Sequence, residues 1–314
     1  MTMDSQSLWL FGGLLGLLSV ASGVGFMLAQ REWPEKQRGV IENLNARIYA
    51  WWIMAAVLGG ALALGKGATV LLFALMSFVG LREFITLTPT RAGDHRALFW
   101  AFFIILPLHY ATLYAEWYGL FVVLIPVYAF LFIPMRNAMA GDTDHFLERT
   151  AKVQWGLMVS VYFTSYAPAL LLLDIPGFAH QQVKLVFFLI FVVQISDVLQ
   201  YCWGKLCGKR ALAPRVSPSK TLEGLVGGGL SAVACGALLS CITPFTWWQA
   251  GLLSAAIVVM GFFGGLVMSA IKRDRGVKDY GELIPGHGGM MDRIDSICFA
   301  APVFFHLVRY FFTV

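Results

Sequence analysis

The sequence predicts an all-α integral membrane protein that crosses the bilayer several times. Apolar residues make up 58% of the 314 residues, charged residues make up 13%, and the mean hydropathy is +0.71. Ordinary soluble proteins contain about 25% charged residues. A helix needs about 20 apolar residues to cross the hydrocarbon layer, and about ten stretches approach or reach that length. These stretches lie near residues 8–29, 48–65, 67–87, 97–115, 117–135, 153–173, 185–203, 222–242, 249–271 and 296–313.

The basic residues are distributed unevenly among the loops between these stretches. Five loops share one side of the membrane if successive loops alternate sides: 30–47, 88–97, 136–152, 204–221 and 272–293. They hold 19 of the 23 Lys and Arg residues. Because loops rich in Lys and Arg stay in the cytoplasm, we expect both termini on the outer side of a bacterial inner membrane. The net charge of +5 then reflects topology and does not indicate a nucleic-acid partner.

Two regions of different content divide the chain. Residues 1–184 predict about six transmembrane helices joined by modest loops, with no constellation that indicates chemistry. Residues 185–314 predict a catalytic transmembrane region, because the polar insertions 204–221 and 272–293 interrupt its apolar stretches. Both insertions fall on the predicted cytoplasmic side, so we expect the active-site loops there.

Polar side chains in the N-terminal region have structural explanations. Arg82 and Glu83 are adjacent near the cytoplasmic end of the third stretch, which favours an Arg that extends to the interface beside a paired neighbour. Asp142, Asp144 and His145 share a loop with glycine and threonine, which favours a solvated loop over a metal site.

The first insertion is preceded by a carboxylate inside an apolar stretch. Asp197 is expensive to place there unless it is paired or coordinated, so it is a candidate functional residue. Ser217 is suited to an N-cap and Pro218 to the first helical position, which predicts Lys220 in the first turn of the eighth helix. A helix start with a lysine can bind an anion, although helix caps are common and this segment alone indicates only a helix start.

The second insertion, within residues 269–295, places cations directly after an apolar helix. Lys272 and Arg273 taken alone are typical of basic residues that anchor a helix at the cytoplasmic surface, and Lys278 and Asp279 taken alone are typical of a surface pair. The residues after Lys278 are not explained by anchoring alone, and they indicate a site for chemistry.

A glycine-rich turn and two carboxylates complete this second insertion. His287 lies in the turn IPGHGG, whose Gly288 and Gly289 allow backbone amides to approach a phosphate closely. Asp292 and Asp295 are three residues apart and share one face if a helix begins there. Carboxylates together with substrate phosphates are the usual ligands of Mg²⁺, so the sequence predicts a magnesium and phosphate site.

At these residues the chain resembles the CDP-diacylglycerol synthases, also called phosphatidate cytidylyltransferases. The family signature runs from S-x-[apolar]-K-R through K-D-x-[small] to H-G-G-[apolar]-x-D-R-[apolar]-D. The matching positions are Ser269, Lys272, Arg273, Lys278, Asp279, Gly281, Pro285, His287, Gly288, Gly289, Asp292, Arg293 and Asp295. Two upstream segments match as well, at Asp197, Tyr201, Gly204, Ser217, Pro218, Lys220, Thr221, Glu223 and Gly224. The resemblance covers about residues 190–305.

The chain departs from that family pattern at one position. Many bacterial members have a Gly-Asp pair four residues before the signature serine, and this aspartate contributes to metal binding, whereas this chain has Gly264 and Gly265. Other members have glycines there, so the departure does not exclude activity. It changes the expected ligand set, and we expect Asp197 to join Asp292 and Asp295 around Mg²⁺.

The resemblance implies transfer of CMP from CTP to phosphatidic acid, with CDP-diacylglycerol and pyrophosphate as products. The residues it implies as catalytic are Lys272, Arg273, His287, Asp292, Arg293 and Asp295. Those it implies for binding CTP and phosphate are Ser217, Lys220, Lys278, Gly288 and Gly289. The expected partners are CTP, phosphatidic acid, the lipid bilayer and a second copy of the chain in a homodimer.

Other functions fit parts of the same sequence. A CTP-dependent kinase or a cytidylyltransferase that acts on another lipid phosphate would use similar chemistry. A transporter or anion channel would account for ten helices and Asp197, but it would not need the complete loop signature. A CDP-alcohol phosphotransferase is disfavoured, because its D-G-x-x-A-R pattern is absent from the sequence.

Overall fold

The computed structural model describes residues 5–31, 34–87, 90–283 and 288–313. Most of these residues are helical, which confirms the predicted all-α membrane fold. The first helices are α1 (Ser5–Ala29), α2 (Glu35–Leu64) and α3 (Lys66–Thr86). The helical run that follows consists of η1 (Ala92–Asp94), α4 (His95–Trp100), η2 (Ala101–Ile105) and α5 (Leu106–Tyr114).

The middle of the chain forms two further helical runs with local changes of helix type. The first consists of α6 (Tyr118–Val123), η3 (Leu124–Ala129) and α7 (Phe130–Ala138). The second consists of α8 (Phe146–Leu157), η4 (Met158–Phe163), α9 (Thr164–Ala169) and η5 (Leu170–Leu172). Pro126 lies within η3, a π-helical turn, and proline cannot donate the backbone hydrogen bond of a regular helix.

The C-terminal region holds two long helices, α10 and α12, and the only hairpin of the described residues. Its elements are α10 (Val183–Cys207), β1 (Ala211–Ala213), β2 (Ser217–Thr221), η6 (Gly224–Gly228), α11 (Gly229–Leu238), η7 (Leu239–Ile242), α12 (Trp247–Asp274), α13 (Met291–Ile294) and α14 (Ile297–Phe312). The two strands pair antiparallel, with Ala211 opposite Thr221 and Ala213 opposite Ser217.

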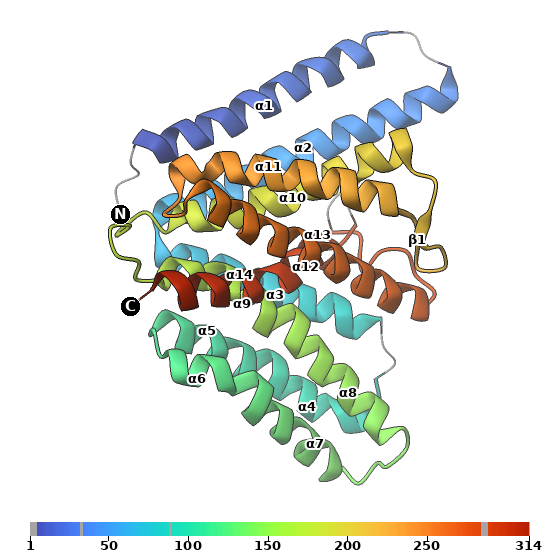
Figure 1. Ribbon diagram of the computed structural model, residues 1–314. Helices are drawn as coiled ribbons and strands as arrows, with labels where there is room; N and C mark the ends of the chain where they lie inside the picture. The colour runs from blue at the N-terminus through green and yellow to red at the C-terminus, as the bar shows by residue number, and fades with distance from the viewer. Residues whose placement is uncertain (1–4, 32–33, 88–89, 284–287, 314) are drawn as a thin grey trace.

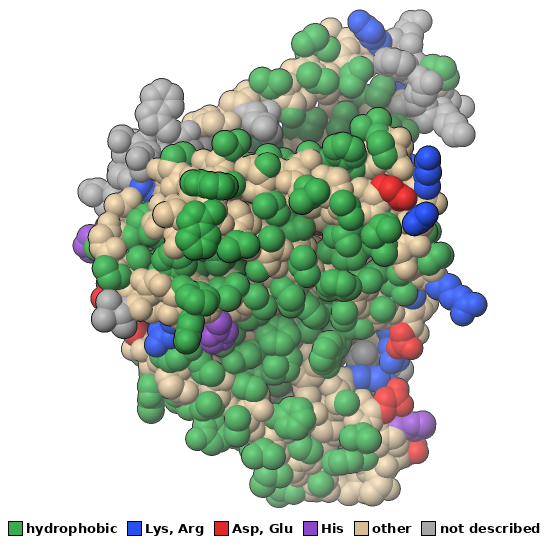
Figure 2. Space-filling view, in the orientation of Figure 1, with side chains coloured by type: hydrophobic (Ala, Val, Ile, Leu, Met, Phe, Trp, Pro, Cys, Tyr) green, Lys and Arg blue, Asp and Glu red, His purple; other side chains and the backbone are tan. Residues whose placement is uncertain are grey.

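Nine helical segments within the described ranges are long and apolar enough to cross a membrane, and residues Leu18–Ala29 of α1 add a shorter apolar helix. These ten segments correspond to the ten predicted stretches. Figure 1 shows that α1 begins and α14 ends at one end of the bundle, whereas the β1–β2 hairpin lies at the other end. Figure 2 shows apolar side chains across the middle of one face and charged side chains mainly at its edges.

One part of the first insertion differs from the prediction. The expectation that Lys220 lies in the first turn of a helix is wrong, because Ser217–Thr221 form strand β2 and the helix begins at Leu222. Thr221 caps this helix instead of Ser217, since its Oγ1 accepts the N–H of Gly224 at 3.1 Å. The helix start therefore moves by about one turn, and Lys220 projects from the strand that precedes it.

Glycines allow the helices of the C-terminal region to approach one another closely. A Cβ at Gly227 would lie 2.7 Å from the Trp203 ring of α10, and a Cβ at Gly264 would lie 2.8 Å from the Asp295 carbonyl oxygen. Close packing of this kind leaves no space for a side chain at either position. The first contact joins η6 to α10 and the second joins α12 to the start of α14, and these elements surround the predicted site.

Candidate active site

Asp197, Lys220 and Asp295 gather around Ser296 at the junction of α10, α12 and α14. The Ser296 hydroxyl donates to Asp197 Oδ2 at 3.4 Å, and the Ser296 N–H donates to Asp295 Oδ1 at 2.7 Å. A Cβ at Gly265 would lie 2.9 Å from Lys220 Nζ and 3.9 Å from Asp295 Oδ2. Residues from the two ends of the C-terminal region are thus brought into one cluster.

Lys220 is half-buried within this cluster. Its Nζ donates to the Phe262 carbonyl oxygen at 3.2 Å and lies 4.7 Å from the centre of the Phe262 ring. Burial lowers the pKa of Lys220 from its ordinary value, and the carboxylates of Asp197 and Asp295 act in the opposite direction. The ammonium group is therefore held close to two anions in a partly dehydrated position.

Asp292 belongs to a different set of contacts. Its Oδ1 accepts Lys272 Nζ at 2.6 Å, and its Oδ2 accepts the N–H groups of Tyr280 at 2.7 Å and Gly289 at 3.0 Å. Asp292 and Lys272 are both buried. Because three protein donors engage its two oxygens, this carboxylate holds the second insertion in place.

The donor set fits a magnesium ion at Asp197 and Asp295 better than at all three aspartates. Asp197 is exposed and Asp295 is half-buried, so both are within reach of a substrate. Within the part of the chain that the structure describes, no group of three or more His, Cys, Asp or Glu side chains is arranged for a metal. Mg²⁺ is usually held by one or two carboxylates plus substrate phosphates, which is the arrangement these two residues offer.

Arg293 contributes a cation beside the same carboxylates. It lies close enough to Asp295 and Asp292 for electrostatic interaction. Its Nε is buried and has no hydrogen-bond partner in the described ranges. A buried donor of this kind is costly unless a ligand or water satisfies it, so Arg293 is suited to bind a phosphate oxygen.

The remaining predicted residues take different positions. Arg273 is exposed and donates to the carbonyl oxygens of Val216 at 3.3 Å and Val277 at 2.9 Å, so it joins the two insertions. Lys278 is exposed, and Ser217 is half-buried in β2. His287 lies outside the described residues.

Gly288 and Gly289 lie against side chains of the protein. Gly288 has a positive φ of 78°, and a Cβ there would lie 2.9 Å from Asp292 Oδ2. The Gly289 amide donates to the same oxygen. The Gly289 amide was predicted to bind phosphate. It is already engaged by Asp292 and is therefore not available for that role.

Glu83 contacts the segment that carries Asp292 and Asp295, a contact that the sequence analysis missed. It is buried in α3, and its carboxylate accepts the N–H groups of Met290 at 2.9 Å and Met291 at 2.8 Å. Arg82, by contrast, is exposed. The interpretation of Arg82 and Glu83 as an interfacial pair is therefore wrong for Glu83. A carboxylate within an apolar helix was the signal that could have identified it.

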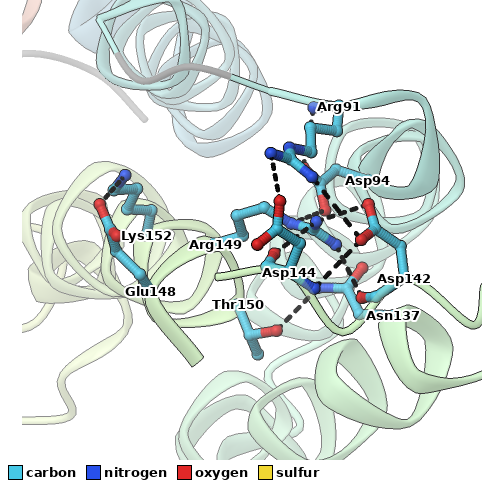
Figure 3. Close-up of polar contacts among 9 residues, drawn as sticks. All are labelled: Arg91, Asp94, Asn137, Asp142, Asp144, Glu148, Arg149, Thr150 and Lys152. Atoms are coloured by element: carbon cyan, nitrogen blue, oxygen red, sulfur yellow. Dashed lines mark hydrogen bonds and ion pairs between the residues drawn. The ribbon is translucent and has the colours of Figure 1, made fainter. Parts of the chain in front are cut away.

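A second charged cluster joins the ends of α4, α7 and α8. Arg149 donates from Nε to Asp94 at 3.0 Å and from Nη1 to Asp142 at 2.6 Å, and Arg91 pairs with Asp144 at 2.5 Å (Figure 3). Hydrogen bonds from the Asp144 backbone N–H and from Arg149 lower the pKa of Asp142. Asp144 and His145 are exposed, as predicted for a solvated loop, and Asp142 and Asp144 also form ion pairs that connect two loops.

The fold and the site together define a polytopic membrane protein with carboxylates and cations gathered between its C-terminal helices. Residues 45–311 match the model of the cytidylyltransferase family. The chain belongs to this family, and the resemblance found in the sequence is confirmed. Membership of this family supports a nucleotidyltransferase that uses CTP and a lipid substrate.

Individual relatives extend the comparison over the chain. The protein named "Uncharacterized protein YnbB" of Escherichia coli (strain K12) is 38% identical over 95% of this chain and 96% of its own length. The phosphatidate cytidylyltransferase of Bacillus subtilis (strain 168) is 28% identical over 88% of this chain and 98% of its own. The phosphatidate cytidylyltransferase of Mycobacterium leprae (strain TN) is 38% identical over 54% of this chain and 53% of its own.

Proposed function

We propose that the protein is a phosphatidate cytidylyltransferase, which transfers CMP from CTP to phosphatidic acid. A phosphate oxygen of the lipid would bond to the α-phosphorus of CTP, and the bond from this phosphorus to the bridging oxygen of pyrophosphate would break. CDP-diacylglycerol and pyrophosphate would be the products. The observation that carries this proposal is the cluster of Asp197, Lys220 and Asp295 beside Arg293.

The chemistry of this reaction suits the residues present. The acceptor is a phosphate monoester whose second pKa is about 6, so near neutral pH it is already nucleophilic and needs no strong general base. The remaining difficulty is repulsion between two polyanions. Lys220 and Arg293 would offset charge on the triphosphate and on the departing pyrophosphate. Lys272 would act through Asp292, which it holds at 2.6 Å.

Magnesium would complete the site. Asp197 and Asp295 are the residues that would hold it, and the ion would supply charge stabilisation for the phosphoryl oxygens. Asp292 leaves this proposed ligand set, because its oxygens are engaged by Lys272 and by two backbone amides. CTP is a soluble nucleotide, so we place this end of the bundle on the cytoplasmic side, in agreement with the basic loops.

The surroundings of the site support a lipid acceptor. An apolar hollow of about 650 Å³ runs along α14 and is lined by Phe163, Met260, Phe299, Pro302, Val303, His306, Leu307, Tyr310 and Phe311. Phe299 also lies against Gly264 beside the Asp295 carbonyl oxygen. From Phe299 to Phe311 the helix rises about 18 Å, which compares with about 15 Å for half of the hydrocarbon layer. An acyl chain would fit along this path while its phosphate lies near Asp295.

Labelled CTP tests the proposal against its alternatives. The purified protein in phospholipid vesicles is supplied with phosphatidic acid, Mg²⁺ and CTP labelled in either the α- or the γ-phosphate. Lipid products are then separated by thin-layer chromatography. Cytidylyl transfer moves only the α-label into lipid. Entry of the γ-label would indicate a kinase instead, and uptake of a labelled solute without CTP would indicate a transporter.

A further inference from the structure

Glu83 joins the N-terminal helices to the segment that carries the site aspartates. Its Oε1 accepts the Met290 N–H at 2.9 Å and its Oε2 accepts the Met291 N–H at 2.8 Å. These two amides stand at the start of α13, where backbone donors have no partner within the helix. The carboxylate of α3 therefore satisfies donors that lie more than 200 residues away in the sequence.

Glycines of the signature make room for this carboxylate. A Cβ at Gly281 would lie 3.0 Å from Glu83 Oε1, and a Cβ at Gly289 would lie 2.7 Å from Glu83 Cδ. Glu83 could not move away from such a Cβ without giving up its two hydrogen bonds. The absence of a side chain at these glycines is thus explained by Glu83, with no need for a phosphate at either position.

The same face of α3 contacts α13 one turn earlier. A Cβ at Gly80 would lie 3.4 Å from Met291 Sδ and 3.5 Å from Ile294 Cδ1. Residues three apart on a helix share a face, so Gly80 and Glu83 present one continuous surface to α13. This packing places the segment against α3 independently of the two hydrogen bonds.

The segment held in this way carries the charges of the proposed site. Asp292 directly follows Met291, and Arg293 and Asp295 lie within one further turn. Lys272 fixes Asp292 from α12, so the segment is fastened on one side by α12 and on the other by α3. Displacement of α13 would shift Arg293 and Asp295 relative to Asp197 and Lys220.

We infer that Glu83 is a positioning residue for cytidylyl transfer, and that it acts by holding α13 so that Arg293 and Asp295 face the substrates. This inference rests on the proposed function. It assigns α3, a helix of the N-terminal region, a part in the reaction. A displacement of about 1 Å can lower turnover about 100-fold, so the contact is expected to act on kcat.

A double-mutant cycle between Glu83 and Gly289 tests this inference on the full-length protein in vesicles. Gly289→Ala is expected to lower kcat by about tenfold or more, because its Cβ displaces the carboxylate. Glu83→Ala should lower kcat to a similar extent. In the double variant the two losses should not add, since the residue that the new Cβ displaces is gone. If Gly289→Ala costs the same factor with alanine at position 83, the inference is overturned.

Conservative and neighbouring variants separate positioning from loss of fold. Glu83→Gln keeps the size of the side chain but offers only one acceptor to the two amides, so kcat should fall while KM for CTP changes by less than about threefold. Arg82→Gln changes the adjacent exposed residue and should retain kcat within about twofold. Wild-type kcat in Glu83→Gln and Glu83→Ala would overturn the inference.

Hydrogen exchange without substrates distinguishes this inference from the proposed function. The Met290 and Met291 amides should exchange faster in Glu83→Gln than in the wild-type protein, because one of their acceptors is lost. Unchanged exchange in a protein that still transfers CMP would overturn the inference alone. Absence of CMP transfer by the wild-type protein would overturn the proposed function and the role in turnover, while faster exchange would still establish the contact.

Discussion

The Lys272 ammonium nitrogen lies 2.6 Å from Oδ1 of Asp292, and both side chains are buried. Tyr280 and Gly289 donate backbone N–H groups to the other oxygen of the same carboxylate. One ion pair therefore joins the end of α12, the loop after it and the start of α13. Because breaking a buried pair leaves one charge without compensation, the two signature residues are expected to matter first for structure.

Asp292→Asn should destabilise the protein by about 3 to 5 kcal/mol, because it leaves the Lys272 ammonium buried without an anion. The measurement is the free energy of unfolding from denaturant titration in detergent. Asp279→Asn is the matched control, since Asp279 is an exposed aspartate of the same insertion. Equal stabilities of the two variants would contradict the anchoring role. Lys272→Met combined with Asp292→Asn should recover part of the loss, because neither partner is then charged.

Asp295→Asn and Asp197→Asn should act on the magnesium requirement. Loss of a carboxylate at the proposed ion site is expected to raise the Mg²⁺ concentration for half-maximal activity by about tenfold or more. The measurement is a Mg²⁺ titration of CMP transfer at saturating CTP. Asp274→Asn serves as the control, because Asp274 pairs with Arg275 at the end of α12, outside the cluster of Asp197 and Asp295. An unaltered titration in both variants would remove these residues from the ion site.

Lys220→Arg should shift the alkaline limit of activity. Burial lowers the pKa of Lys220, so the folded protein loses this charge at a lower pH than an exposed lysine would. If the ammonium stabilises phosphate charge, kcat/KM for CTP falls as the pH rises through that lowered pKa. Arginine stays charged, so the alkaline limb should move to higher pH in the variant.

The control for this pH profile is Lys209→Arg, which changes an exposed lysine of the same insertion. Its alkaline limb should coincide with that of the wild-type protein. An unmoved limb in Lys220→Arg would show that another group sets the alkaline limit.

Much of this organisation could be predicted from local sequence. Apolar length predicted the membrane helices, because spanning the bilayer is a requirement that each helix meets by itself. The polar insertions could be located for the same reason. The signature residues could be matched to a family because their spacing lies within 27 residues of chain.

Contacts between distant segments could not be predicted in this way. Asp292 and Asp295 are three residues apart and were expected to share one ion, but Lys272 from another helix engages Asp292. Glu83 gave no local sign of its partners, which lie in the second insertion. The strand at Lys220 depends on pairing with Ala211–Ala213, and such pairing overrides the capping pattern of Ser217 and Pro218.

Gly265→Asp tests how closely Lys220 is coupled to the proposed ion site. A Cβ at position 265 would lie 2.9 Å from Lys220 Nζ, 3.3 Å from Ser296 Oγ and 3.9 Å from Asp295 Oδ2. Lys220 is the flexible end of a side chain and can yield to the added atom, so the variant is expected to fold. Its new carboxylate should pair with the ammonium, or bind the ion together with Asp295.

The Mg²⁺ titration and kcat together distinguish a carboxylate that binds the ion from one that pairs with Lys220. A carboxylate that joins the ion lowers the Mg²⁺ concentration for half-maximal activity, whereas one that only neutralises Lys220 lowers kcat and leaves that concentration unchanged. Gly265→Asn supplies the same bulk without the charge and is the matched control. If the Asp and Asn variants have the same kcat and the same Mg²⁺ titration, a charge at position 265 does not affect binding of the ion. Gly265 would then serve only the close approach of α12 to Ser296 and Lys220.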